Sequence, residues 1–186
     1  IGLSGYILWG LSPIFWKALN QVEAMDIVSW RVICTFVFVA ACNLLLRLTR
    51  RGKVTPLPFL RNKLSMLGGG LIGLNWGMFV WAVESERVVE ASLGYFMNPL
   101  MNVFLGVVFL GEALRKAQWL AVTFAAAGVL WLTISLNAFP WVSLTLAISF
   151  ALYGLIRKVA PASPLQGLSV ETSVLLIPAV AFVLLR

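Results

Sequence analysis

The chain has 186 residues, of which 61% are hydrophobic and only 11% are charged. A mean hydropathy of +0.95 excludes an ordinary soluble domain and indicates an integral membrane protein. The net charge of +7 would suit a nucleic-acid-binding protein, but the basic residues gather in loops and therefore indicate membrane topology. The chain contains no histidine, which excludes histidine-based zinc, haem and serine-hydrolase chemistry within it.

A hydropathy window of about 19 residues predicts seven membrane spans. Such segments are long enough to cross a hydrocarbon core of about 30 Å as helices. The connections are short except for residues 47–63, which are rich in lysine and arginine and contain Pro56 and Pro58. The predicted spans are residues 2–19, 27–46, 64–83, 92–110, 117–136, 139–156 and 169–185.

Lysine and arginine are distributed unequally between the two sets of loops. The second-to-third, fourth-to-fifth and sixth-to-seventh connections carry ten of them, whereas the alternate side carries only Lys17 and Arg87, with five acidic residues. The positive-inside rule therefore predicts cytoplasmic basic loops and a cytoplasmic N-terminus. That orientation argues against a rhodopsin-like receptor, whose N-terminus lies outside.

The first two predicted spans contain polar and aromatic candidates for a site. Trp9, Pro13 and Trp16 share one helical face, and Trp9 is a candidate for lining a substrate cavity. Trp16 and Lys17 have an equally ordinary interpretation as interfacial anchors. Arg31 lies about one turn inside its span, and a buried arginine costs about 2.5–3.5 kcal/mol at the membrane centre. It is expected either to reach toward the interface or to pair with an acid, for which the candidates are Glu23, Asp26 and Glu84.

The third predicted span carries two overlapping Gly-x-x-x-Gly steps. Gly69, Gly73 and Gly77 repeat every four residues, so a neighbouring helix can approach their face closely. We expect this face to serve helix packing. Asn75 lies off it and is a candidate for lining a cavity.

The fourth predicted span is the most unusual. Its amide stripe, defined as Gly94, Asn98, Asn102 and Gly106, repeats every four residues. Pro99 has no N–H, so the carbonyl of Tyr95 loses its helical partner. These polar groups must face protein or a water-filled cavity, because lipid cannot satisfy them. Two interpretations stay open: the amides join helices together, or they line a translocation path with Tyr95.

A weak internal repeat links the two ends of the chain. Lys17 follows Trp9 by eight residues and Lys158 follows Phe150 by eight, while Arg31 and Glu171 come 14 and 13 residues after the respective lysines. The two sets lie at opposite ends of their helices, as in inverted-repeat transporters. Glu171 is a candidate proton-coupling acid, because burial near the inner end of a span can tune the protonation of a carboxylate. Glu112 is expected at the cytoplasmic end of the fourth helix, beside Arg115 and Lys116.

Several segments together resemble a known family. They include Ser29-Trp30-Arg31-Val32, the run Ala-Ser-Leu-Gly-Tyr-Phe-x-Asn-Pro-Leu at residues 91–100, and Leu110-Gly111-Glu112. The chain resembles EamA-domain permeases of the drug/metabolite transporter superfamily, and RarD-type proteins above all. The resemblance implies a ten-helix fold of two inverted five-helix repeats, in which residues 1–136 form the first repeat and residues 137–186 begin the second. The chain, which starts at Ile1 and stops at Arg186 beside apolar runs, is accordingly expected to be part of a longer protein.

The sequence thus predicts an all-α integral membrane protein with about seven transmembrane helices. It is expected to be a secondary transporter, a multi-pass permease of the bacterial inner membrane that moves a small metabolite or drug-like molecule by alternating access. Expected partners are that molecule, the lipid bilayer and protons as coupling ion, without nucleic acid, metal, cofactor or catalytic residues. The alternative is a non-transporting accessory subunit whose amides only pack helices. An intramembrane enzyme is disfavoured because no span carries paired aspartates. Cavity candidates are Trp9, Arg31, Asn75, Tyr95, Asn98 and Asn102, and packing candidates are Gly69, Gly73, Gly77 and Pro99.

Overall fold

The structure is a computed structural model that describes residue 7 and residues 22–49, 63–135, 139–160 and 163–185. These residues form six long helices and no strand, which confirms the all-α class. Each helix is long and apolar enough to cross a membrane. The second to seventh predicted spans are confirmed to within a few residues, whereas the first, apart from Ile7, lies outside the described residues. The helices are α2 (Ala24–Leu48), α3 (Lys63–Glu84), α4 (Val88–Leu110), α5 (Lys116–Ser135), α6 (Trp141–Val159) and α7 (Pro164–Leu185).

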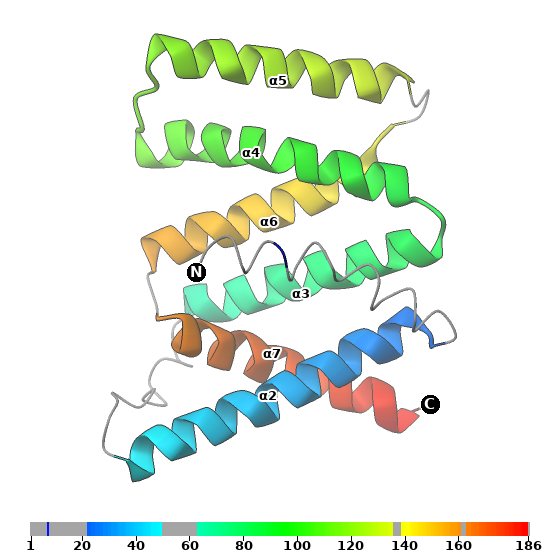
Figure 1. The fold of residues 1–186 in the computed structure, drawn as a ribbon, viewed down its shortest axis with the longest axis vertical. Helices are drawn as coiled ribbons and strands as arrows, with labels where there is room; N and C mark the ends of the chain where they lie inside the picture. The colour runs from blue at the N-terminus through cyan, green and yellow to red at the C-terminus, as the bar shows by residue number, and fades with distance from the viewer. Residues whose placement is uncertain (1–6, 8–21, 50–62, 136–138, 161–162, 186) are drawn as a thin grey trace.

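The helices do not pack in the order of the chain. Figure 1 shows α5, α4, α6 and α3 side by side in that order, followed by α7 and α2, which cross each other. The later helix α6 therefore lies between α4 and α3, and both α7 and α2 contact α3. The central helix α3 contacts both later helices, so residues distant in sequence meet in the middle of the bundle.

The bundle has two chemically different ends. At the acidic-loop end lie the start of α2, the turn between α3 and α4, and the start of α6 (Figure 1). At the basic-loop end lie the start of α3, residues 111–115 between α4 and α5, and the junction of α6 with α7. At the acidic-loop end Glu86 adopts φ = 58°, and at the basic-loop end Gly111 adopts φ = 64°, where glycine is favoured as a helix C-cap.

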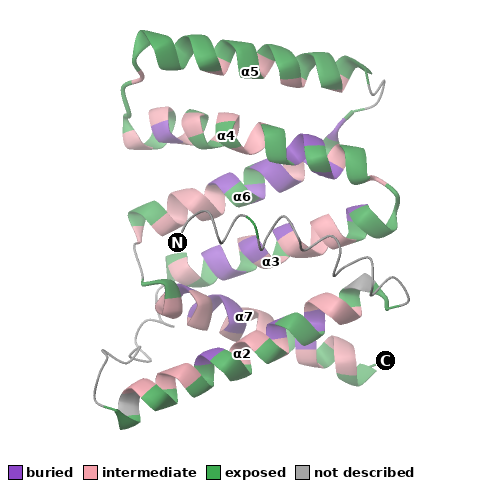
Figure 2. Ribbon diagram, in the orientation of Figure 1, coloured by how far each residue is buried: buried purple, intermediate pink, exposed green. Residues whose placement is uncertain are grey.

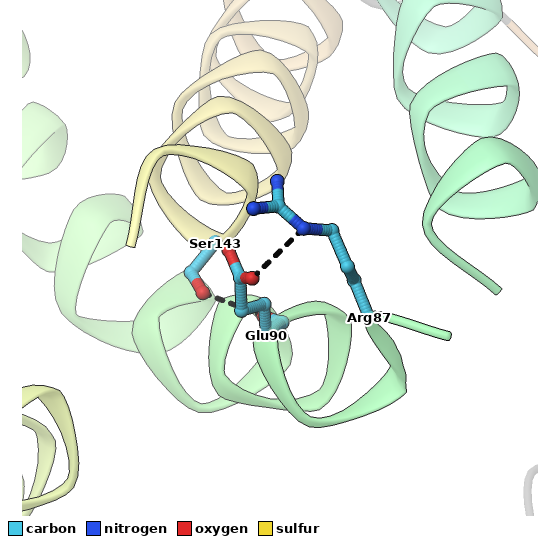
Figure 3. A network of polar contacts seen from close by, with 3 residues as sticks. All are labelled: Arg87, Glu90 and Ser143. Atoms are coloured by element: carbon cyan, nitrogen blue, oxygen red, sulfur yellow. Dashed lines mark hydrogen bonds and ion pairs between the residues drawn. The ribbon is translucent and has the colours of Figure 1, made fainter. Parts of the chain in front are cut away.

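The helix contacts are closest between α4 and α6. A Cβ atom at Gly94 would lie 3.1 Å from the carbonyl oxygen of Ser143 and 3.1 Å from the Leu146 Cβ, so only glycine allows this approach without a shift. The Ser143 hydroxyl donates to the carbonyl of Glu90 at 2.6 Å, and Arg87 Nε pairs with Glu90 Oε1 at 3.2 Å (Figure 3). A small apolar core surrounds this junction, formed by Ala82, Ala91, Val142 and Leu146, with Met78 and Phe79 packed against it.

Two of the three glycines of the α3 face meet α7. A Cβ atom at Gly69 would lie 3.3 Å from the Glu171 Cα, and one at Gly73 would collide with the Leu175 side chain. Gly77 has nothing within 4 Å of that position. The close approach of α3 to α7 therefore depends on the first two glycines.

Burial is concentrated in the inner helices. Figure 2 shows buried positions along α3, α4, α6 and α7, whereas α5 is exposed along most of its length. Trp131 of α5, for example, is 73% exposed. In a membrane protein, such apolar surface is suited to lipid or to further transmembrane helices.

Candidate substrate site

An arginine and a tryptophan meet inside the membrane-spanning region. The guanidinium carbon of Arg31, on α2, lies 4.0 Å from the centre of the Trp76 ring, on α3. Arg31 is seven residues from the acidic-loop end of its helix and Trp76 is eight residues from the same end of α3. At 1.5 Å per residue, both lie about 10–12 Å from the helix ends. This geometry is a cation–π interaction, which stabilises the charge without neutralising it.

Two further aromatic rings join these residues. Tyr95 of α4 lies about 10 Å from its helix end, at the same depth. Its ring meets Phe79 edge to face, with 5.8 Å between the ring centres, and its hydroxyl lies within electrostatic range of Arg31. The Tyr95 side chain is still 43% exposed. Residues Arg31, Trp76, Phe79 and Tyr95 thus form one group from α2, α3 and α4, called here the arginine–aromatic cluster.

The structure decides how Arg31 is accommodated. The sequence left open an ion pair with Glu23, Asp26 or Glu84, but in the described residues Arg31 pairs with none of them. Arg31 as a whole residue is exposed, so the contact with Trp76 does not enclose it. A cation with an aromatic contact and no paired acid is suited to binding an anionic group.

The amide stripe contacts α6 at two of its positions, Gly94 and Asn102. Gly94 contacts Ser143, as described above, and the Asn102 Oδ1 lies 3.5 Å from where a Cβ of Gly154 would be. Asn98 Oδ1 is buried without a hydrogen-bond partner within the described residues. Pro99, a predicted packing residue, is exposed. The α6 contacts at Gly94 and Asn102 support the packing interpretation there, whereas the buried oxygen of Asn98 is explained by neither interpretation within the described residues.

Asn75 points toward α6. Its amide nitrogen donates to the carbonyl of Leu146 at 2.9 Å and to the Ser149 hydroxyl at 3.0 Å, and the residue is only 8% exposed. These two bonds join α3 to α6. The sequence had placed Asn75 among the cavity candidates, whereas its amide nitrogen makes interhelical contacts here.

Glu171 lies near the opposite end of the bundle. It is 7% exposed, and its Oε1 accepts a hydrogen bond of 2.7 Å from the Tyr153 hydroxyl. Both residues line a crevice between α3, α6 and α7, beside Arg157, whose guanidinium packs on Gly167. The sequence identified Glu171 but not its partner. Tyr153 and Glu171 are each nine residues from position 162 in the sequence, so the antiparallel helices α6 and α7 place them at the same depth. This equal spacing could have identified Tyr153 as the partner of Glu171.

A second polar contact near this end was not predicted. Glu112 was expected beside Arg115 and Lys116, but its carboxylate pairs with Lys158 at the end of α6. The carboxylate also lies against Gly106, where a Cβ would be 2.7 Å from Oε2. The ion pair therefore joins the end of α4 to the end of α6 at the basic-loop end.

Trp9, the remaining cavity candidate, lies outside the described residues. Within them, no group of three or more histidine, cysteine, aspartate or glutamate side chains is placed to hold a metal ion.

Comparison with known proteins agrees with this architecture. The profile of the EamA-like transporter family matches residues 1–134. The chain belongs to this family. Among the relatives of this EamA-like chain are the RarD protein of Streptomyces exfoliatus, 44% identical over 98% of the chain and 58% of the relative, and the RarD protein of Escherichia coli K12, 41% identical over 95% and 60%. An uncharacterized transporter of Vibrio cholerae is 41% identical over the whole chain and 61% of its own length.

These matches confirm the resemblance to RarD-type permeases. The EamA-like chain spans about three fifths of the length of the relatives it matches. No solved structure matches it significantly. Family membership together with six membrane-length helices makes it a multi-pass membrane protein of a transporter family.

Proposed function

We propose that the protein to which this chain belongs is a secondary transporter that moves a small molecule across the bacterial inner membrane by alternating access. The observation that carries the proposal is the arginine–aromatic cluster. Its Arg31, Trp76 and Tyr95 come from three helices, lie at one depth and bring a positive charge among aromatic rings inside a membrane-spanning bundle. Polar and charged groups at such depth typically mark substrate pathways. The excess of lysine and arginine at the basic-loop end supports a cytoplasmic N-terminus.

Glu171 is proposed as the coupling acid. It lies about 10 Å from the basic-loop end, so the cluster and the carboxylate are near opposite ends of the bundle. A buried carboxylate that accepts one hydrogen bond from Tyr153 can exchange a proton through the adjoining crevice. Glu171→Gln keeps an oxygen for the Tyr153 bond but cannot ionise. We expect this variant to lose pH-gradient-driven accumulation while retaining exchange of internal for external solute.

A non-transporting role as a helix-packing subunit is the second candidate. It is favoured by Asn75, whose amide nitrogen is used in contacts with α6, and by the contacts of Gly94 and Asn102 with the same helix. These contacts explain Asn75 and Asn102 without any substrate. They do not involve Arg31, Trp76 or Tyr95. Variants of the packing residues and variants of the arginine–aromatic cluster therefore distinguish the packing role from the transport role.

The test measures flux through the full-length protein in proteoliposomes. A mixture of small metabolites is supplied outside, and the solutes that enter are identified by mass spectrometry against protein-free liposomes. Trp76→Leu and Tyr95→Phe should reduce saturable uptake at least several-fold without loss of folded protein. Trp131→Leu, on the exposed face of α5, is the matched control and should transport normally. Absence of saturable uptake for every solute, with the protein folded, would favour the packing role.

A further inference from the structure

We propose that the arginine–aromatic cluster binds the carboxylate of a small organic acid. The inference rests on the proposed function, because it names the substrate class of the same site. It follows from the charge of Arg31, from its surroundings and from the comparison with a second arginine in the same bundle.

The first step concerns the charge. The chain contains seven acidic residues, and all seven lie within the described ranges: Glu23, Asp26, Glu84, Glu86, Glu90, Glu112 and Glu171. None of them forms an ion pair with Arg31. The segment 1–21 contains no acid at all. Within the described residues, therefore, no carboxylate pairs with this cation, although a charge at membrane depth is costly without one.

The second step compares Arg31 with Arg87. Arg87 also lies over tryptophans, 5.8 Å from the ring centre of Trp81 and 5.2 Å from that of Trp141. Its charge is paired with Glu90 at 3.2 Å. The described residues thus place two arginines in aromatic surroundings near the same end, and they pair an acid with only Arg87. The Arg31 guanidinium is the one whose charge an external anion could balance.

The third step concerns shape. A guanidinium presents its N–H donors as a planar fork that matches a carboxylate with two parallel hydrogen bonds. Trp76 lies against the Arg31 guanidinium, and the described residues give the guanidinium no ion-pair partner while Arg31 as a residue is exposed. The rings of Trp76, Phe79 and Tyr95 offer apolar surface beside the guanidinium. The cluster therefore suits a molecule with one carboxylate and a small, flat apolar body.

The experiment uses matched acids and amides with the full-length protein in detergent. The probes are benzoate with benzamide, and indole-3-acetate with indole-3-acetamide, which differ in charge but hardly in shape. Binding is measured as a ligand-dependent shift of the unfolding temperature and by titration calorimetry. We expect each acid to bind at least tenfold more tightly than its amide, because hydrogen bonds to a charged partner are stronger than neutral ones.

Variants assign the preference to Arg31. Arg31→Gln should weaken acid binding about ten- to a hundredfold and leave amide binding unchanged. Arg31→Lys keeps the charge but loses the fork, so its acid affinity should fall between the two. Arg87→Gln is the matched control and should keep the acid preference of the unmodified protein.

Two results would overturn the proposal. One is equal affinity of the unmodified protein for acids and amides. The other is an acid preference that survives in Arg31→Gln. If the unmodified protein shows no acid preference and Arg31→Gln also unfolds at a much lower temperature, the proposal is likewise overturned. That combination would indicate that Arg31 pairs with a carboxylate outside residues 1–186 of the full-length protein. Since binding is measured without flux, Arg31-dependent binding by a protein that fails to transport would refute the proposed function and leave this inference standing.

Discussion

At the scale of single residues, Arg31 and Glu171 each lie about 10 Å inside the bundle, from its acidic-loop end and its basic-loop end respectively. Hydropathy and spacing placed Arg31 and Glu171 inside their spans, because the distance along a helix follows directly from residue number. The contact of Arg31 with Trp76 could not be predicted, since it depends on which helices are neighbours. The amides of α3 and α4 show the same limit: Asn75 and Asn98 are chemically alike, yet the Asn75 amide is bonded to α6 and the Asn98 oxygen has no partner within the described residues.

That difference gives a prediction for the two asparagines. Asn75→Leu removes the donor of two bonds between α3 and α6, and interhelical hydrogen bonds in membranes contribute about 0.6 kcal/mol each on average. We expect it to lower the free energy of unfolding by about 1 kcal/mol or more. Asn98→Leu removes an oxygen that makes no bond within the described residues and should cost less. Both variants are compared by thermal unfolding of the full-length protein in mild detergent. Equal losses would contradict the assignment.

At the scale of helices, the predicted spans and the observed helices agree closely because apolar length sets both. The spans 64–83 and 92–110, for example, became Lys63–Glu84 and Val88–Leu110. The order in which the helices pack was not predictable from hydropathy, which reports burial in lipid or protein alike. The insertion of α6 between α3 and α4 depends instead on particular small residues such as Gly94 and on bonds such as that from Ser143 to Glu90.

The glycine face of α3 can be tested at this scale. Gly73→Leu would bring a side chain into the space of Leu175 on α7, and overpacking of this kind typically costs about 1–3 kcal/mol. Gly77→Leu is the matched control, because nothing lies within 4 Å of a Cβ there among the described residues. We expect only Gly73→Leu to lower the unfolding temperature of the protein in detergent. A comparable loss for Gly77→Leu would show that another helix covers Gly77 in the complete protein.

At the scale of the whole molecule, the interleaved order suggests where further helices would pack. If α6 and α7 begin an inverted copy of the first two spans, the contact of α3 with α7 should have a counterpart between α2 and a helix beyond residue 186. The contacts of α6 with α3 and α4 should likewise have counterparts between the first predicted span and later helices. The relatives are long enough for such helices, since the chain spans about three fifths of their length.

These missing contacts give a prediction for the chain by itself. Within the described residues Arg31 has no paired acid, and Arg31 and Tyr95 of the arginine–aromatic cluster are exposed, so these helices alone do not form a closed binding cavity. We expect this chain, expressed alone, to insert into membranes, to unfold at a lower temperature than the full-length protein, and to show no saturable uptake in proteoliposomes. The full-length protein should have the higher unfolding temperature and the saturable uptake, because added helices would bury polar groups that are costly to expose to lipid. Saturable uptake by residues 1–186 alone would show that alternating access needs no second repeat, and the inverted-repeat arrangement would then have to be rejected.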